Sequence, residues 1–472
     1  MTTPGKIGLV DRTLRNLRGA WNDIAQAVSG TRGGAADPSL PAEDSAHLLE
    51  QMRACLEGRG GEVSARARAA ALGRTYLALN GEGRRRFLAI LANDFDVDQS
   101  VVDAAILSVE RAKDASARRQ AERRLRAALD APRIKLLRQF TELPDGVKFL
   151  VDLRAELLAA GQGDQAMAAL EADLKALLSS WFDVGFLELR RIAWDSPAAL
   201  LEKLIAYEAV HEIEGWNDLK NRLDSDRRCF AYFHPRMPAE PLIFVEVALS
   251  HGLAGSIQRL LDSSAPVQDP RRADTAIFYS ISNAQKGLVG ISFGGFLIKR
   301  VVEELAAEFH NLKDFATLSP MPGFRRWLEL ELKAGRASLL PAEARALAAL
   351  RAGAAQEGGL GALLQSAGWE AEPALAQALK APLMRLGASY LANERREDGR
   401  ARDPVAHFHL SNGARIEQLD WLADRSEKGI SQSYGMMVNY RYLQSEIEAN
   451  HEAYTGEGKV AAAAAVKALL RS

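Results

Sequence analysis

The feature that most constrains the fold is a change in residue pattern near position 225. From about 46 to 180 the chain is rich in Ala, Leu, Arg and Glu, and apolar residues recur three and four positions apart, as at Leu125 and Leu129. This is the period of amphipathic helices that pack into a bundle. Later runs at 241–249 and 275–282 are β-branched and apolar, which is typical of buried strands. The sequence therefore predicts an α+β protein, with an N-terminal all-α helical bundle followed by a mixed domain.

The length of 472 residues is too great for one ordinary hydrophobic core, so we expect more than one domain. The boundaries that we predict are a flexible N-terminal segment and linker at 1–45, a helical domain at 46–180 and a second domain at 181–472. Alanine-rich helical periodicity returns at about 326–400, which indicates a helical insertion in the second domain.

Composition narrows the classes of partner and compartment. The formal net charge is -1, so no global field attracts nucleic acid or acidic lipid. No apolar run approaches the roughly 18 residues of a membrane span. Two cysteines, Cys55 and Cys229, favour a reducing compartment. We expect a cytoplasmic protein that binds neither nucleic acid nor membrane, although an amphipathic stretch at 9–28 leaves an organellar form open.

Histidine is scarce, with 8 residues, and two of them lie close together in the segment 404–414. We predict that His407 and His409 lie on one face of a strand, followed by an Asn-Gly turn and then a helix through Trp421. A histidine at a strand end is well placed as an acid or base near neutral pH. The alternatives are a hydrogen-bonded core histidine, or a pair of metal ligands for which no third ligand is evident.

A strand, a glycine-rich turn and a helix are predicted in succession over 275–305. Glycines and a helix N-terminus let a phosphate approach the backbone N–H groups. The turn lacks a Walker lysine-serine pair and a G-x-G-x-x-G pattern, so a nucleoside triphosphate or a dinucleotide is not favoured. The pyrophosphate of an acyl-CoA would suit the turn, and a glycine-rich connection without a ligand is the alternative.

The same stretch contains G-x-S-x-G around Ser292, the pattern of the hydrolase nucleophile elbow. Asp403 and His409 follow it in hydrolase order. The residues before it, 284–289, are too few and too polar for the buried strand that an elbow serine follows. An α/β-hydrolase-type thioesterase that uses Ser292 therefore stays the second hypothesis.

Two further segments carry hydroxyl groups that a polar site could use. Ser319 precedes the rigid turn Pro-Met-Pro-Gly, and on its own it is an ordinary turn serine. Tyr440 and Tyr442 lie in a stretch whose aromatic spacing favours the core, although either hydroxyl could serve a polar site.

Taken together, these motifs resemble the malonyl-CoA decarboxylase family, in family order and over nearly everything from about 130 to the end. The segments that carry the resemblance are 178–187, Ala-Ile-Phe-Tyr-Ser-Ile-Ser at 276–282, 295–302, Leu-Ser-Pro-Met-Pro-Gly-Phe at 318–324, 381–386, His-Leu-Ser-Asn-Gly-Ala at 409–414 and Asn-Tyr-Arg-Tyr at 439–442.

The resemblance implies a helical domain used in oligomerisation, suggesting a homotetramer, and a catalytic domain similar to the GNAT acyl-CoA N-acetyltransferase fold. It implies that Ser319 and His409 are catalytic, with Ser280 and Tyr442 as accessory residues. Some relatives have a glutamate where this chain has Ser292. The implied CoA-contacting turn consists of Val289, Gly290, Ile291, Ser292, Phe293, Gly294 and Gly295.

The implied reaction is the decarboxylation of malonyl-CoA to acetyl-CoA and carbon dioxide through a thioester enolate. We expect His409, with a pKa near neutral, to deliver a proton to the enolate carbon. Ser319 would orient His409 or bind the malonyl carboxylate. No metal or organic cofactor is expected, because the thioester is itself the electron sink. A catalytically silent acyl-CoA sensor is a third hypothesis, and an acetyltransferase on the same fold is also possible.

Overall fold

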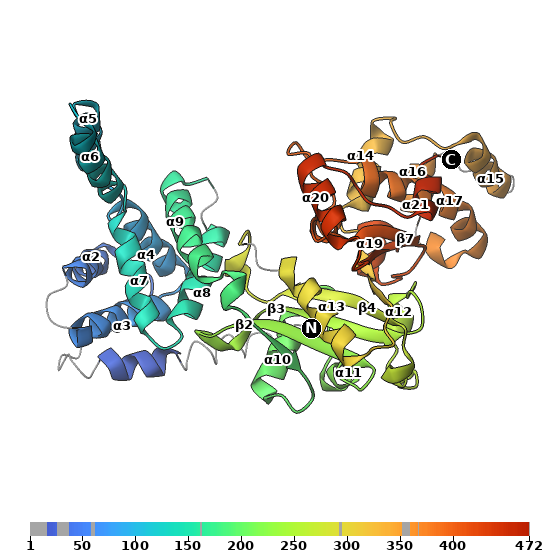
Figure 1. Ribbon diagram of the computed structural model, residues 1–472, viewed down its shortest axis with the longest axis horizontal. Coiled ribbons are helices and arrows are strands. Elements are labelled where there is room, and N and C mark those ends of the chain that lie inside the picture. The colour runs from blue at the N-terminus through green and yellow to red at the C-terminus, as the bar shows by residue number, and fades with distance from the viewer. Residues whose placement is uncertain are drawn as a thin grey trace. The chain divides into compact units, whose positions relative to one another are not determined.

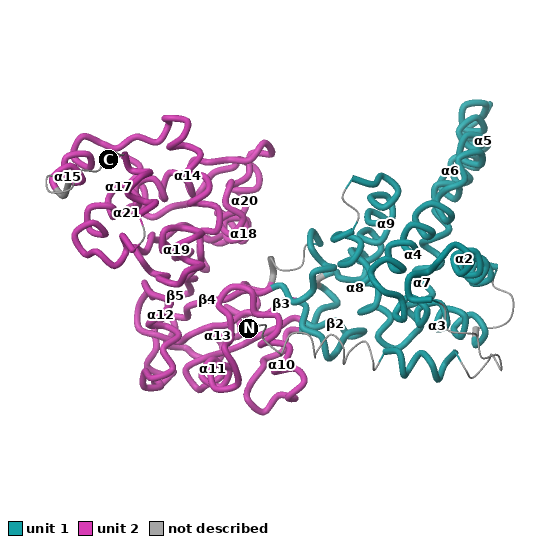
Figure 2. The backbone as a smooth tube through the Cα atoms, turned by 180° about the vertical axis from the view of Figure 1, so that it is seen from behind, with its two compact units in different colours: residues 1–188, 233–242, 283–293 teal, residues 189–232, 243–282, 294–472 magenta. Residues whose placement is uncertain are grey.

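The structure is a computed structural model, and it describes residues 17–25, 37–57, 62–160, 163–291, 295–351, 359–366 and 368–471. The chain divides into two compact units (Figure 2). The first contains residues 1–188, 233–242 and 283–293, and the second contains 189–232, 243–282 and 294–472. The order of a helical region followed by a region with a mixed sheet confirms the predicted α+β class.

The first unit is built mainly from helices whose apolar faces are buried. Asp or Asn caps begin several of them, such as Asn80 before α4, whose side chain accepts hydrogen bonds from two backbone N–H groups of the first turn. Helices α5 and α6 form a pair that projects from the other helices of this unit (Figure 1). Besides a helical segment at 17–25, the helices are α2 (Ala42–Leu56), α3 (Glu62–Ala78), α4 (Gly81–Asn93), α5 (Gln99–Glu110), α6 (Ala115–Ala128), α7 (Pro132–Gln139), α8 (Gly146–Ala160) and α9 (Gln165–Trp181).

An eight-stranded sheet is the framework for the candidate site. Its order is β1-β2-β3-β4-β5-β8-β6, and β7 also pairs with β8. Strands β4 and β5 are parallel, with Phe278 opposite Thr317, whereas β8 is antiparallel to β5, β6 and β7. The strands are β1 (Glu188–Ile192), β2 (Arg227–His234), β3 (Met237–Ser250), β4 (Thr275–Asn283), β5 (Asp314–Thr317), β6 (Ser319–Pro320), β7 (Arg415–Asp420) and β8 (Met437–Arg441).

Among the described residues, the second unit also contains twelve α-helices, and one of them, α13, lies across the strands of the sheet (Figure 1). The helical texture predicted at 326–400 corresponds to helices from α14 to α17. The helices are α10 (Ala198–Tyr207), α11 (Trp216–Arg222), α12 (Ile257–Leu260), α13 (Gly295–Glu308), α14 (Phe324–Lys333), α15 (Pro341–Arg351), α16 (Leu360–Gln365), α17 (Pro373–Asn393), α18 (Pro404–Ser411), α19 (Glu427–Ser433), α20 (Ile447–Glu457) and α21 (Ala464–Leu469).

The prediction for the histidine segment was wrong in its secondary structure. The segment 404–411 is helix α18, and the residues after it form strand β7, so strand and helix are exchanged. Asp403 caps the helix by accepting from the N–H groups of Val405 and Ala406, and Pro404 occupies the first helical position. These start signals outweigh the strand-like composition of a short segment.

The end of α18 explains the predicted Asn-Gly turn. Gly413 has a φ of 81°, and its N–H donates to the carbonyl of Leu410, while the N–H of Ala414 donates to the carbonyl of His409. This is the hydrogen-bond pattern of a Schellman motif, which ends helices. The Asn-Gly pair therefore ends a helix, where the sequence analysis expected it to connect a strand to a helix.

Gly287 gives a test of how tightly the chain is packed just before the predicted CoA-contacting turn. A Cβ atom at Gly287 would lie 1.8 Å from the carbonyl oxygen of Val151 on α8. We expect Gly287→Ala to lower the free energy of unfolding by about 1–3 kcal/mol, because backbone has to move. The measurement is chemical denaturation of both proteins. Gly456→Ala is the control, since nothing lies within 4 Å of its Cβ position. Equal stability of the two variants would contradict this packing.

Candidate active site

The candidate site forms around His409, in the last turn of α18. Its Nε2 atom lies 3.2 Å from the hydroxyl oxygen of Ser319, and its Nδ1 atom lies 2.7 Å from the hydroxyl oxygen of Tyr442. Both ring nitrogens therefore have hydroxyl partners. The ring is also stacked on Tyr440, with 4.6 Å between centroids and 23° between planes. The structure thus brings together Ser319, His409 and Tyr442, which are three of the four residues that the resemblance implies as catalytic or accessory.

Strand β8 positions the two tyrosines. Tyr440 lies opposite Ile416 of β7, and Tyr442 follows directly after β8, where its N–H donates to the carbonyl of Phe315 at 2.8 Å. Ser319 lies opposite Val438 in the β6–β8 pair. One strand therefore fixes the hydroxyl groups on both sides of the histidine ring.

Burial determines the charge of His409. The residue is 2% exposed, and burial lowers the pKa of its imidazole to about 3. The predicted pKa near neutral is therefore wrong, and the ring is neutral at physiological pH. The C-terminal end of a helix favours a protonated histidine by only a modest amount, and here burial outweighs it. Burial likewise raises the pKa of the Tyr442 phenol, which keeps its proton.

His407 has a separate environment. Because neighbouring helix positions differ by about 100°, residues two apart point to nearly opposite sides, so the expectation that both rings share one face was wrong. The Nδ1 atom of His407 lies 2.9 Å from the hydroxyl of Tyr454. Among the described residues, no three His, Cys, Asp or Glu side chains are grouped as a metal ion would require.

Ser280 is held by the carboxylate of Glu208, which belongs to none of the predicted motifs. Its hydroxyl donates to Glu208, 2.8 Å from each carboxylate oxygen, and Ser282 donates to the same carboxylate at 3.0 Å. The N–H groups of Val210 and His211 donate to it as well. Glu208 is buried and follows α10, where nothing in the local pattern marks it.

The register of the parallel strands β4 and β5 shows how Ser280 and Ser319 are placed along the sheet. Phe278 of β4 lies opposite Thr317 of the parallel strand β5, and each serine follows two residues later along its own chain segment. Ser280 therefore lies in the second half of β4, and Ser319 begins β6 directly after the end of the neighbouring strand β5. We find no direct hydrogen bond between Ser280 and the His409 group, so Ser280 belongs to an adjoining cluster.

The predicted CoA-contacting turn is described only in part. Val289 is 61% exposed, Gly290 has a φ of 76° and Ile291 donates its N–H to Leu288. Helix α13 begins at Gly295. Ser292, which is the serine of the hydrolase-elbow pattern, lies outside the described residues, as do Phe293 and Gly294. The ammonium of Lys175, on α9, lies 3.4 Å from the Cβ position of Gly290.

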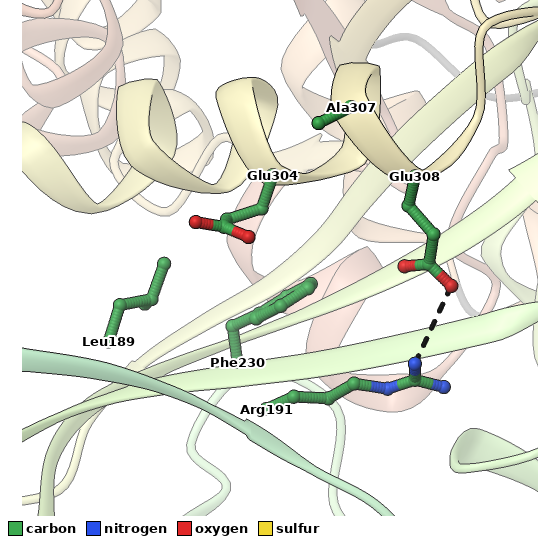
Figure 3. Close-up of a pocket in the computed structure, with 6 residues that line it drawn as sticks. All are labelled: Leu189, Arg191, Phe230, Glu304, Ala307 and Glu308. Carbon is green, nitrogen blue, oxygen red and sulfur yellow. Dashed lines mark hydrogen bonds and ion pairs between the residues drawn. The ribbon is translucent and has the colours of Figure 1, made fainter.

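A separate pocket lies between α13 and the strands β1 and β2 (Figure 3). It has a volume of about 490 Å³, and an ion pair between Arg191 and Glu308, at 3.5 Å, lies across it. Arg228 also pairs with Glu308. None of its lining residues is a candidate site residue, and its arginine and one glutamate are already paired. The pocket is lined by Leu189, Arg191, Phe230, Glu304, Ala307 and Glu308.

The chain is similar to known proteins over most of its length. A mitochondrial malonyl-CoA decarboxylase from Rattus norvegicus is 40% identical over 408 residues, which are 82% of this chain and 82% of the relative. One from Anser anser anser is 38% identical over 467 residues, 95% of this chain and 92% of the relative. The crystal structure of malonyl-CoA decarboxylase from Agrobacterium vitis has a TM-score of 0.81 and 42% identity, covering 90% of this chain and 99% of that one. The corresponding structure from Rhodopseudomonas palustris has a TM-score of 0.79 and 41% identity, with the same shares of each chain covered.

Family models give the same result. The malonyl-CoA decarboxylase N-terminal domain matches residues 95–182, and the malonyl-CoA decarboxylase C-terminal domain matches residues 185–472. The second match alone includes Ser280, Ser319, His409 and Tyr442, together with the fold elements that carry them. This chain belongs to the malonyl-CoA decarboxylase family.

Proposed function

We propose that this chain decarboxylates malonyl-CoA to acetyl-CoA and carbon dioxide. The observation that carries the proposal is the buried His409, bonded through one ring nitrogen to Ser319 and through the other to Tyr442, in a chain of this family. A ring held at both nitrogens has a fixed orientation, as proton transfer to a carbon atom requires.

The reaction needs one bond cleavage and one proton. The bond between C2 of the malonyl group and its carboxylate carbon breaks, and carbon dioxide leaves. The electron pair of that bond passes into the thioester, giving an enolate. C2 then takes a proton, and acetyl-CoA results. The protein has to stabilise the enolate oxygen and supply the proton. Hydrogen-bond donors aimed at that oxygen contribute about 3–4 kcal/mol each in comparable sites.

His409 is the proposed proton donor to C2. In the free enzyme its ring is neutral, because burial disfavours the charged form. A malonyl carboxylate bound beside the ring would reverse that preference, since an opposite charge nearby favours the imidazolium. When the substrate binds, His409 therefore takes up a proton from solvent, and the ring gives it to C2 once the carboxylate has left as carbon dioxide.

The other residues have proposed supporting roles. Ser319 orients His409 through Nε2, and Tyr442 orients it through Nδ1. Ser280, a residue of β4 held by Glu208, is an accessory residue near the reacting group. The turn from Val289 to Gly295 binds the CoA phosphates, and the ammonium beside Gly290 supports this, because Lys175 supplies a positive charge there. We also propose that no metal or organic cofactor takes part.

Assembly and compartment are further proposals. We propose a homo-oligomer formed through the helical domain, with a tetramer as the expected state. Exposed apolar side chains on the projecting α5–α6 pair support it: Val101 is 51% exposed and Leu107 is 46% exposed. We propose a cytoplasmic location. No helix in the part of the chain that the structure describes is long and apolar enough to cross a membrane.

The first test is to identify the products. Purified protein is incubated with malonyl-CoA and EDTA, without added cofactor, and the mixture is followed by mass spectrometry. We expect acetyl-CoA and carbon dioxide in equal amounts. Free CoA with malonate would instead favour the Ser292 thioesterase, and tight binding without turnover would favour an acyl-CoA sensor. Loss of activity in EDTA that one added metal restores would contradict the proposal that no metal takes part.

The role of His409 is tested with a control on the same helix. We expect His409→Gln to lower kcat by about 10²–10⁴-fold, because the proton donor is lost. Ser319→Ala should cause a smaller loss, since the ring remains but its orientation is less fixed. His407→Gln is the matched control, because His407 contacts Tyr454 instead of this group. Steady-state kinetics with folded variants measures the effect. Nearly full turnover in His409→Gln would show that another group supplies the proton.

The pH dependence of kcat/KM tests proton uptake on substrate binding. This parameter reports ionisation in the free enzyme. Because the pKa of free His409 is about 3, its protonated fraction above that value falls about tenfold for each unit that the pH rises. We therefore expect kcat/KM to fall with rising pH between about pH 6 and 8, approaching that slope. A flat profile over this range would mean that the neutral ring is the reactive form.

A further inference from the structure

Thr317 lies directly behind the Ser319–His409 pair and is completely buried. It is the last residue of β5, and its carbonyl oxygen accepts a hydrogen bond of 2.6 Å from the side chain of Asn439. Its hydroxyl oxygen accepts from the N–H of Tyr440 at 3.1 Å. Strand pairing with Phe278 fixes its backbone. The Thr317 hydroxyl is therefore a rigidly placed group in the interior.

The hydroxyl of Ser319 donates its hydrogen to the hydroxyl oxygen of Thr317, at 2.8 Å. A serine hydroxyl has one hydrogen to donate and two lone pairs that accept. With that hydrogen committed to Thr317, Ser319 can only accept from the Nε2 atom of His409, 3.2 Å away. The ring hydrogen of His409 must then be on Nε2.

The other side of the ring agrees with this assignment. A neutral imidazole carries one N–H, so Nδ1 is an acceptor when Nε2 carries the hydrogen. The hydroxyl of Tyr442, 2.7 Å from Nδ1, supplies the matching donor. Burial keeps the Tyr442 phenol protonated by raising its pKa. The donors run in one direction, from Tyr442 to His409, then to Ser319 and finally to Thr317.

We propose that Thr317 is a positioning residue, which sets this direction and holds the ring hydrogen of His409 on the nitrogen that faces Ser319. The proposal rests on the proposed decarboxylase function and adds a residue to it. Thr317 acts through Ser319 and His409, without contact to the substrate.

The direction of the hydrogen bonds separates this pair from a hydrolase pair. In a serine nucleophile, the hydroxyl donates to the histidine, which then takes the proton as a base. Here Thr317 receives the Ser319 hydrogen instead, so the histidine faces the serine with a hydrogen already in place. The Ser–His contact therefore leaves Ser319 without a base that could activate it as a nucleophile.

The test combines Thr317→Val with Thr317→Ser. Valine has nearly the shape of threonine but no hydroxyl, so the Ser319 hydrogen is free to turn toward Nε2 of His409. Serine keeps the acceptor. Nitrogen NMR of protein labelled at the histidine rings distinguishes protonated from unprotonated ring nitrogens, and His409→Gln identifies the His409 signals.

In the wild type we expect the hydrogen on Nε2. In Thr317→Val we expect it on Nδ1, with kcat at least about tenfold lower, because the imidazolium that forms with bound substrate then keeps its Nδ1 hydrogen and has to give up the one on the Ser319 side. Thr317→Ser should restore the Nε2 form and most of the turnover. An unchanged tautomer and unchanged kcat in Thr317→Val would overturn the proposal.

Loss of the acceptor for Tyr440 N–H also lowers the stability of the fold, so Thr317→Val needs a circular dichroism check. If it does not fold, the wild-type spectrum still decides: a hydrogen on Nδ1 in an active wild type overturns the role of Thr317, and one on Nε2 supports it. A wild type that forms no acetyl-CoA from malonyl-CoA overturns the proposed function instead.

Discussion

The candidate site depends on strand β8, which pairs with β5, β6 and β7 at once. The pairings with β5 and β6 join segments that are more than a hundred residues apart, such as Ala316 with Arg441. They place Tyr440 against the face of the His409 ring and Tyr442 at its edge. They also anchor Thr317 through Asn439. Without β8 the hydroxyl groups around the histidine would have no common framework.

The sequence predicted helices and strands correctly where the residue pattern is long or periodic. The helical region before residue 180, the strands now seen as β3 and β4 and the helix α13 all have strong local signals, and these signals led to the α+β class. The predicted secondary structure of residues 404–420 was wrong, because the composition of the first half favours a strand while the residues at its boundaries favour a helix. Asp403 and Pro404 at the start and Gly413 at the end were visible, and they determine the outcome.

The site itself was only partly accessible from the sequence. The resemblance pointed to Ser319, His409 and Tyr442, and the structure brings these three together, while their catalytic roles stay predictions. Thr317 and Glu208 could not be found, because their importance lies in contacts across long stretches of chain. The lowered pKa of His409 could not be predicted from the sequence either, because burial causes it and no residue pattern shows how deeply one ring is buried.

The Schellman motif that ends α18 restricts which residues can occupy position 413. Gly413 has a φ of 81°, and a Cβ atom there would lie 2.1 Å from the carbonyl oxygen of Ile447. Its neighbour Ala414 bonds to the carbonyl of His409. Any other residue at 413 would therefore disturb the backbone that carries the histidine. In a survey of natural variants, this glycine, which has no side chain to take part in the chemistry, would tolerate change as poorly as an active-site residue.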